Sequence, residues 1–373
     1  MKTTLLSILT FSVLVANAQK EKKQIPPKEK FVTIRMSKLP MAEFPRNSIR
    51  VSGITVIQSL SDSFRMGYTL KGMDNAVATL KFSKPLSQIL QEQVKRMYKH
   101  EYKKDGAAIF WVVKELRFGA KSGATANSFT RIVTSPDCSF TRFNADAYIS
   151  DDGNLFKKIC TIDTVLVVLN MGSEHGPDLE NAIRVLLRRT LLAAEHIPEQ
   201  NSVKMTIEEI SNEASQQVNI PILTDGNYHE GIYTGFGKFL ANKPSENAYE
   251  IVMDKKKKVK FTTEGQNGQR DTIEIWGLCK DGKIYKYHNE TLIPIKKEGH
   301  RFIISDYVEE TTRLNNTTPG FGLAIGYGLL SIPIFSYQKK NRPLLVESIP
   351  YIDDPERQPI ATCIDMKTGE LSF

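Results

Sequence analysis

The chain has 373 residues, of which 25% are charged and 40% apolar, and its formal net charge is +8. This is the composition of a soluble globular protein, and its length predicts two domains because hydrophobic cores stop growing near about 250 to 300 residues. A basic balance can indicate nucleic acid or an anionic surface as a partner. The basic residues are scattered, however, with tight groups only at 20–23 and 255–258, so nucleic-acid binding is not predicted.

The first 18 residues are typical of a secretory signal peptide. Lys2 provides a basic start, residues 5–15 are apolar, and small residues precede the expected cleavage after Ala18. No cysteine follows the apolar run, so lipid attachment is not expected. We expect residues 19–30 to be a disordered leader. The mature protein is then exported, and is periplasmic, outer-membrane-associated or extracellular.

Residues 31–200 are expected to form a layered α/β domain. The elements that periodicity predicts are strands over 31–36, 49–57, 107–118, 140–149 and 155–169, and helices over 83–98 and 177–194. Asp152-Gly153 marks the turn of a long hairpin between the last two strands. These elements predict two helices on a four- or five-stranded, largely antiparallel sheet, and an α+β protein overall.

The order of these elements resembles the auxiliary and lipoprotein components of bacterial envelope transport systems. In those proteins a first strand ends in an Asp-x-Arg turn and is followed by a helix, a strand, a hairpin with an Asp-Gly turn and a closing helix. The corresponding turns here are residues 62–67 and 152–153. The resemblance implies a role in an envelope transport or assembly system, although the cysteine of a lipoprotein is missing.

A helical connector is expected over 201–218 and a β-rich module over 219–312. The expected strands of the module are 249–253, 259–263, 271–279, 284–287, 291–295 and 301–308. Asp281-Gly282 lies between two runs of alternating hydrophobicity and predicts a tight hairpin. In that hairpin Trp276 falls opposite about Tyr287, which predicts a cross-strand aromatic pair.

This module resembles one found in uncharacterised exported bacterial proteins. The shared features are the segment 231–245, the Trp-Gly, Asp-Gly and Tyr positions of the hairpin, and an Ile-Asp-x-x-Thr-Gly signature at 364–369. The resemblance implies export and implies no activity. It places the chain in a group without defining what the group does.

The last region, 313–373, contains an apolar, glycine-rich segment at 319–337 whose length is at the margin for spanning a bilayer. Insertion in a membrane and burial against the protein both remain open for this segment. Four cysteines admit three disulfide pairings, but the hairpin places Cys160 opposite about Ala145 and not opposite Cys138. A buried free thiol at Cys160 is therefore as consistent with the pattern as a disulfide.

The candidate residues for contact with a ligand or partner are Glu174, His175, His229, Trp276 and Tyr285. Glu174 and His175 precede a helix and could form an acid/base pair, but a turn and helix cap explain them more simply. The cysteines lack the spacing of a zinc site, and no phosphate-binding or nucleophile motif occurs. No catalytic residue, cofactor or metal is therefore predicted.

These patterns favour an exported, non-enzymatic envelope protein that binds or scaffolds, with another envelope protein or the membrane surface as its partner. One alternative is a membrane-associated component of an envelope transport or assembly system. A second alternative is a secreted hydrolase whose acidic and histidine residues come together only in the fold.

Overall fold

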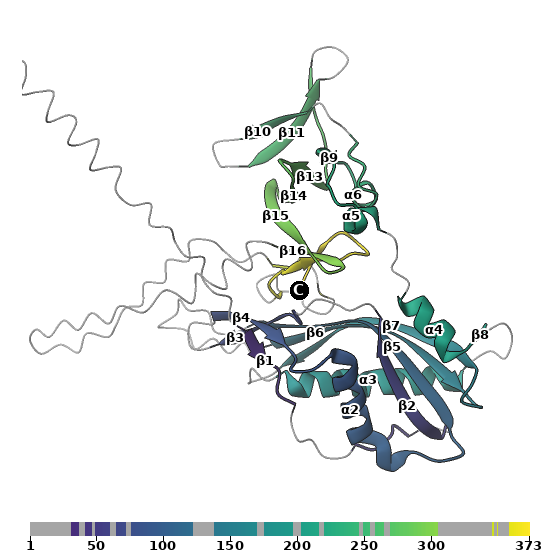
Figure 1. Cartoon of the computed structure of the whole chain (residues 1–373). Helices are drawn as coiled ribbons and strands as arrows, with labels where there is room; N and C mark the ends of the chain where they lie inside the picture. Colours follow the sequence, from purple (N-terminus) through teal and green to yellow (C-terminus); the bar gives the residue numbers. More distant parts are fainter. Residues whose placement is uncertain are drawn as a thin grey trace, which may run out of the picture.

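The computed structural model describes residues 31–36, 42–46, 49–59, 65–71, 76–121, 138–169, 175–196, 203–215, 220–245, 249–253, 258–264, 269–304, 345–346, 349 and 358–373 (Figure 1). The predicted signal peptide and leader and the apolar segment 319–337 lie outside the described residues. Within the described ranges, no helix has the length and apolar character that a membrane crossing requires.

The N-terminal part is built on a five-stranded sheet. Its strands, in spatial order, are β2 (Val51–Gln58), β5 (Ala107–Lys121), β6 (Cys138–Ser150), β7 (Phe156–Leu169) and β8 (Lys204–Met205). β2 runs parallel to β5, and the other neighbours are antiparallel. Successive side chains of a strand point to opposite faces, so alternate residues of each strand line the two faces of the sheet. The α+β class and a largely antiparallel sheet are confirmed, but the strand predicted at 31–36 lies in a separate sheet, and the fifth strand here is the unpredicted β8.

Two helices cover one face of this sheet (Figure 1). They are α2 (Leu86–Tyr98), which continues into the 3-10 turn η1 (Lys99–Glu101), and α3 (Gly176–Glu195). Pro177 lies in the first turn of α3, where the missing amide hydrogen of proline has no helical partner to lose. Their apolar stripes pack on the strands around Trp111, whose Nε1 donates a 3.1 Å hydrogen bond to Thr190 Oγ1. Both predicted helices are therefore confirmed.

The opposite face of the sheet is covered at one end by α4 (Ile207–Ser215). The helix starts with a capping box, in which the Glu209 amide donates to Thr206 Oγ1 and the Thr206 amide donates to Glu209 Oε2. Ile210 is buried against Phe110 of β5. The segment 201–218, which was expected to be a helical connector, thus adds β8 to the edge of this sheet and packs α4 on its face.

A small three-stranded sheet flanks the first one. Its strands, in spatial order, are β1 (Phe31–Thr33), β4 (Ala76–Lys81) and β3 (Tyr68–Lys71). Gly67 connects it to the larger sheet through a bridge to Phe118. A Cβ at Gly67 would lie 1.9 Å from the Phe118 carbonyl oxygen, and φ is +109°, so this close approach requires glycine.

The module contains a seven-stranded antiparallel sheet and a smaller sheet. The strands of the larger sheet, in spatial order, are β18 (Leu371–Ser372), β17 (Cys363–Ile364), β16 (Arg301–Ile304), β15 (Thr291–Glu298), β14 (Lys283–His288), β13 (Gly277–Lys280) and β9 (Gly231–Tyr233). The smaller sheet consists of β10 (Glu250–Met253), β11 (Val259–Glu264) and β12 (Arg270–Thr272), and the short helices are α5 (Pro221–Thr224) and α6 (Phe236–Leu240). The single strand predicted over 271–279 is wrong, because these residues divide between the two sheets.

The Asp281-Gly282 hairpin is confirmed, with φ values of 52° and 69° at the two turn residues. The predicted ring pair between Trp276 and Tyr287 is wrong, although the Tyr287 amide does donate to the Trp276 carbonyl at 2.9 Å. Trp276 packs in one cluster and Tyr287 in another, on the other side of the ladder. The alternation breaks at Gly277, where a Cβ would lie 2.5 Å from the Tyr285 carbonyl oxygen.

All four cysteines are free thiols. Cys160 lies opposite Ala147, two residues from the expected position, because the hairpin turn is longer than predicted and a bulge follows Ala147. Cys138 lies opposite Leu169, so the two cysteines of this hairpin are far apart in the ladder.

Candidate functional site

His175 is buried between the start of α3 and the sheet. Its Nδ1 lies 2.9 Å from Asp178 Oδ2, and Ser139 of β6 donates a 2.9 Å hydrogen bond to Asp178 Oδ1. The aspartate lies between the serine and the histidine, whereas a nucleophilic triad needs the histidine in that position. The hydrogen-bonded group of Ser139, Asp178 and His175 therefore joins the start of α3 to β6. Glu174 lies outside the described residues.

His229 is exposed in a loop of the module. Its amide donates to Asn242 Oδ1 at 3.1 Å, and its carbonyl accepts a 3.0 Å hydrogen bond from Tyr233 Oη. Tyr285 of β14 is half-buried in a cluster with β11 and β13. Within the described part of the chain, no hydrogen bond, ion pair or ring contact joins His175, His229 and Tyr285, so the structure does not assemble them into one site.

Trp276 is buried inside the module. Its ring lies 4.2 Å from Phe239 and 5.2 Å from Phe236, measured between centroids. Its Nε1 donates a 2.9 Å hydrogen bond to the Gly369 carbonyl oxygen. Trp276 thus binds the C-terminal segment of its own chain and is not an exposed ligand platform.

The Ile-Asp-x-x-Thr-Gly sequence forms a turn that presents this carbonyl. Asp365 Oδ1 accepts hydrogen bonds from the amides of Lys367 at 2.7 Å and Thr368 at 3.3 Å. The Gly369 amide donates to the Asp365 carbonyl at 2.8 Å. Asp365 accepts backbone hydrogen bonds as aspartate does in tight turns, and Gly369 supplies the positive φ of 79°. The signature therefore has a local structural explanation.

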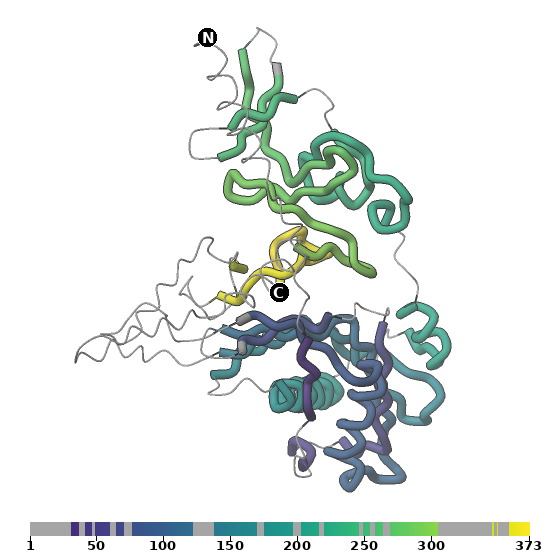
Figure 2. The backbone as a smooth tube through the Cα atoms, turned by 60° about the vertical axis from the view of Figure 1, so that its left-hand side comes forward, coloured from purple at the N-terminus to yellow at the C-terminus, as the bar shows by residue number. Residues whose placement is uncertain are grey.

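The C-terminal segment 358–373 lies between the five-stranded sheet and the module (Figure 2). On the module side, β17 pairs with β16. On the other side, the Ile360 amide donates a 2.6 Å hydrogen bond to Tyr68 Oη, and the ring of Phe373 lies 6.0 Å from that of Phe140. The segment therefore belongs to both parts of the molecule.

Charged side chains from the sheet meet the segment at this junction. Arg142 Nη2 lies 2.8 Å from Asp163 Oδ1 and 3.6 Å from Asp365 Oδ2, and its Nε lies 3.5 Å from Glu115 Oε2. Lys367 Nζ of the segment lies 2.7 Å from Asp163 Oδ2. We define the junction cluster as Glu115, Arg117, Arg142, Asp163, Arg301, Asp365 and Lys367.

The junction cluster is densely charged and largely enclosed. Arg117 is only 2% exposed, and its Nη2 donates a 2.9 Å hydrogen bond to Thr362 Oγ1. Among the described residues, Arg117 Nε and Nη1 have no hydrogen-bond partner. Burial raises the pKa of Glu115, and the charges of Arg117 and Arg142 oppose that rise. Arg301 Nη1 adds a contact of 3.5 Å to Glu115 Oε1.

A second ionic group lies on the same strand of the sheet. Asp146 contacts Lys114 Nζ at 2.6 Å and Lys158 Nζ at 2.8 Å, and Thr161 Oγ1 donates to it at 2.6 Å. Burial alone would raise the pKa of Asp146, but these hydrogen bonds together lower it. In the described ranges, no group of three or more His, Cys, Asp or Glu residues could hold a metal ion. The junction cluster and the Asp146 group are both networks of oppositely charged side chains.

No member of the junction cluster was predicted from the sequence. A signal existed in β6, where Arg142, Asn144 and Asp146 alternate with buried apolar residues. Such alternation indicates a polar second face, whereas a strand covered by apolar elements on both sides would be apolar throughout. The partners on the C-terminal segment carry no comparable signal, because their contacts span more than two hundred positions, as in the 245 between Arg117 and Thr362.

No family model matches the chain, and no curated protein matches it. One solved structure that matches is the crystal structure of protein XCC0632 from Xanthomonas campestris, described as family-model DUF330. It is 12% identical, the match covers 45% of this chain and 97% of that one, and the TM-score is 0.26. At this TM-score the likeness supports no inference about fold or function.

Proposed function

We propose that the protein is an exported, non-enzymatic component of the bacterial cell envelope that acts as a binding or scaffolding unit. The observation that carries this proposal is the C-terminal segment 358–373, which pairs with the module and contacts the sheet through the junction cluster. Ligand sites commonly form between domains. In this chain, its own segment occupies that position, so partner contacts are expected on the outer surfaces.

Two of the candidate residues for ligand or partner contact support the same proposal through their hydrogen bonds. His175 is engaged by Asp178, and Trp276 holds the carbonyl oxygen of Gly369. The apolar run and small residues at the start of the sequence support export. The more specific form of the proposal, a membrane-associated component of an envelope transport or assembly system, draws on the resemblance of the N-terminal elements to such components.

The test of export is the N-terminus of the protein recovered from its native host. Mass spectrometry of the cell-envelope and culture fractions should find a chain that begins at Gln19. Recovery of the intact Met1 terminus from the cytosol alone would overturn export.

The test of binding is recovery of a partner from the native envelope after crosslinking. The tagged full-length chain should retain one or a few envelope components. The variant Arg142→Glu, which places a negative charge beside Asp163 and Asp365, should retain fewer because the two parts separate. The control Arg50→Glu alters an ion pair whose partners are largely exposed, and should bind as wild type. Turnover of an ester, peptide or glycoside substrate that is lost in His175→Ala would overturn a non-enzymatic role.

A further inference from the structure

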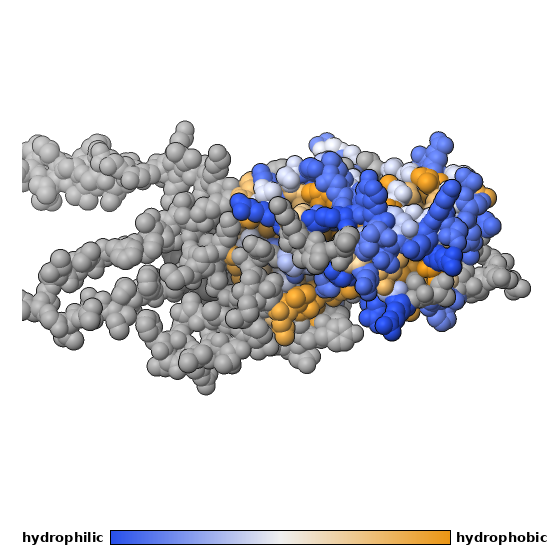
Figure 3. All heavy atoms as spheres, turned by 90° about the horizontal axis from the view of Figure 1, so that it is seen from below, coloured by the Kyte–Doolittle hydropathy of each residue, from blue (hydrophilic) through white to orange (hydrophobic). Residues whose placement is uncertain are grey.

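The helix-bearing side of the N-terminal part exposes many hydrophilic residues (Figure 3). Several of them are cations. They are Arg46, Lys95, Lys99, Arg184 and Arg188. Within the described part of the chain none of these five forms an ion pair, whereas Arg50 and Lys84 nearby are paired with Asp105 and Glu92. Glu43 and Glu195 are also exposed near the ends of this set in the chain. This side therefore carries an excess of positive charge.

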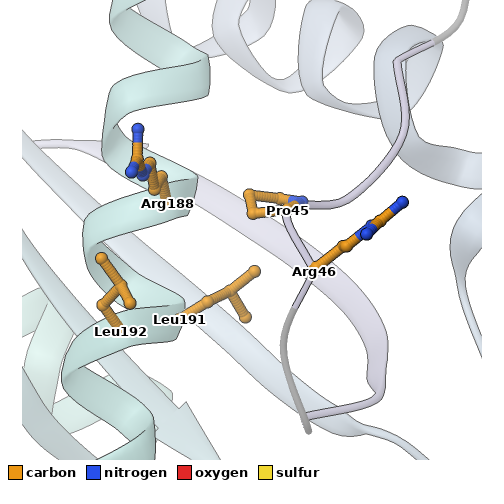
Figure 4. Close-up of a pocket in the computed structure, with 5 residues that line it drawn as sticks. All are labelled: Pro45, Arg46, Arg188, Leu191 and Leu192. Carbon is orange, nitrogen blue, oxygen red and sulfur yellow. The ribbon is translucent and has the colours of Figure 1, made fainter.

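A hollow of about 330 Å³ lies on this side, between α3 and residues 42–46 (Figure 4). It is lined by Pro45, Arg46, Arg188, Leu191 and Leu192. Figure 4 shows the arginine side chains extending away from the apolar ones, so the charges lie at the rim. The volume is at the lower end of ligand pockets, which hold about 300 to 1,000 Å³.

The spacing along α3 aligns charge and apolar surface. Arg184, Arg188 and Leu192 follow each other at intervals of four residues, so they lie along one line of the helix. Leu192 is 48% exposed although it is large and apolar. The apolar face of α3 is buried against the sheet, so α3 does not insert as a free interfacial helix does. Its outer side instead offers a row of arginines that suits phosphate groups, with one exposed leucine beside them.

We propose that this helical side docks on the surface of a membrane that contains anionic phospholipid. Arg46, Arg184 and Arg188 contact headgroup phosphates, and Leu192 inserts at the acyl boundary. The choice of lipid rests on charge complementarity, because the exposed cations of this side suit a surface of phosphates. A protein partner with acidic groups is the alternative that a failure to bind anionic vesicles would favour. The inference rests on the proposed function only in that an exported protein meets a membrane surface.

Vesicle co-sedimentation of the purified full chain without residues 1–18 tests this inference separately from export. The chain should bind vesicles of phosphatidylcholine with 30% phosphatidylglycerol, should not bind pure phosphatidylcholine, and should dissociate as salt is raised. Each basic residue near an anionic surface contributes roughly fivefold in partitioning, so Arg184→Gln with Arg188→Gln should weaken binding about 25-fold. Leu192→Ser should weaken it as well.

The matched control removes two exposed lysines from the module, Lys280→Gln with Lys283→Gln. It should bind as tightly as wild type. An equal loss in both double variants would overturn the helical side as the docking surface, because total charge alone would then explain binding. No binding to anionic vesicles, or full competition by millimolar inorganic phosphate at constant ionic strength, would overturn membrane docking. Neither outcome bears on the N-terminus or on partner recovery, which test the proposed function.

Discussion

Arg142 of β6 lies 3.6 Å from Asp365 of the C-terminal turn, and this contact links the sheet to the segment that completes the module. Arg142 also lies within 3.5 Å of Glu115 and 2.8 Å of Asp163. One guanidinium group thus compensates three carboxylates from three separate parts of the chain. Loss of this cation should affect the junction more than loss of any single acidic partner.

The first prediction concerns Arg142→Met, which keeps most of the side-chain volume and removes the charge. It should lower the free energy of unfolding by about 2 to 3 kcal/mol, slightly less than for a fully buried pair because some solvent reaches this group. Denaturant unfolding measures the loss. The control Arg50→Met breaks an ion pair whose partners are 68% and 67% exposed, and should cost less than about 1 kcal/mol. Equal effects in the two variants would contradict the role of Arg142.

The second prediction concerns pH. Burial raises the pKa of Glu115 in the folded protein, so the folded state holds this proton more tightly than the unfolded state. The contribution of Glu115 to stability should therefore decline as pH rises from the unfolded pKa, near 4.5, through the folded pKa. The difference in unfolding free energy between wild type and Glu115→Gln, measured from pH 4 to pH 8, isolates this contribution. A difference that does not change with pH would contradict it.

Local patterns were sufficient to predict the helices and the long strands. The stripe of α2 repeats every three to four residues, and β6 and β7 flank a turn with Gly153 at φ 74°, so each element is defined by neighbours in sequence. The Asp281-Gly282 hairpin was predictable for the same reason, since its turn needs two residues that accept positive φ.

The junction could not be predicted in this way. Its contacts depend on which face of β6 meets a segment more than two hundred residues later, and no periodicity encodes that choice. The orientation of Trp276 was missed because Gly277 interrupts the alternation of the strand. The interruption turns Trp276 toward Gly369. The contact between them gives a structural role to the Ile-Asp-x-x-Thr-Gly signature, a role that the sequence alone did not indicate.

The third prediction concerns the thiols. Burial raises the pKa of Cys279 to about 11 and also raises the pKa of Cys160. Only about one Cys279 in a thousand is then ionised at pH 8, and the thiolate is the reactive form. Native protein should therefore react slowly with a thiol reagent such as DTNB, with the half-buried Cys160 reacting first. Denatured, unreduced protein should show all four thiols. A count of two would reveal a disulfide.

The fourth prediction concerns Phe373, which is 2% exposed and packs against Phe140. Phe373→Ala should lower the free energy of unfolding by about 3 kcal/mol, as for the deletion of other buried aromatic side chains. Hydrogen exchange of β17 and β18 should accelerate with it. The control Leu169→Ala, at a site 67% exposed, should change stability by about 0.5 kcal/mol or less. If Phe373→Ala matched the control, the segment would not be docked.

The fifth prediction compares two glycines that share a backbone conformation but differ in surroundings. Gly369 has φ +79° and Gly153 has φ +74°, so alanine is strained at both by about 1 kcal/mol. A Cβ at Gly369 would lie 2.5 Å from Phe236 Cγ and 2.7 Å from Trp276 Nε1, whereas nothing lies within 4 Å of one at Gly153. Overpacking adds about 1 to 3 kcal/mol, so Gly369→Ala should destabilise by about 2 to 4 kcal/mol in total.

Gly153→Ala should show the strain alone, and the difference between the two variants then measures the contact between the C-terminal turn and Trp276. Denaturant unfolding, followed by tryptophan fluorescence in a Trp111→Phe background, reports both stability and the environment of that ring. In Gly369→Ala the hydrogen bond from Trp276 Nε1 to the Gly369 carbonyl should also break, because the turn must shift to admit the methyl group. Equal destabilisation of the two variants, with unchanged fluorescence, would show that the turn does not pack on Trp276.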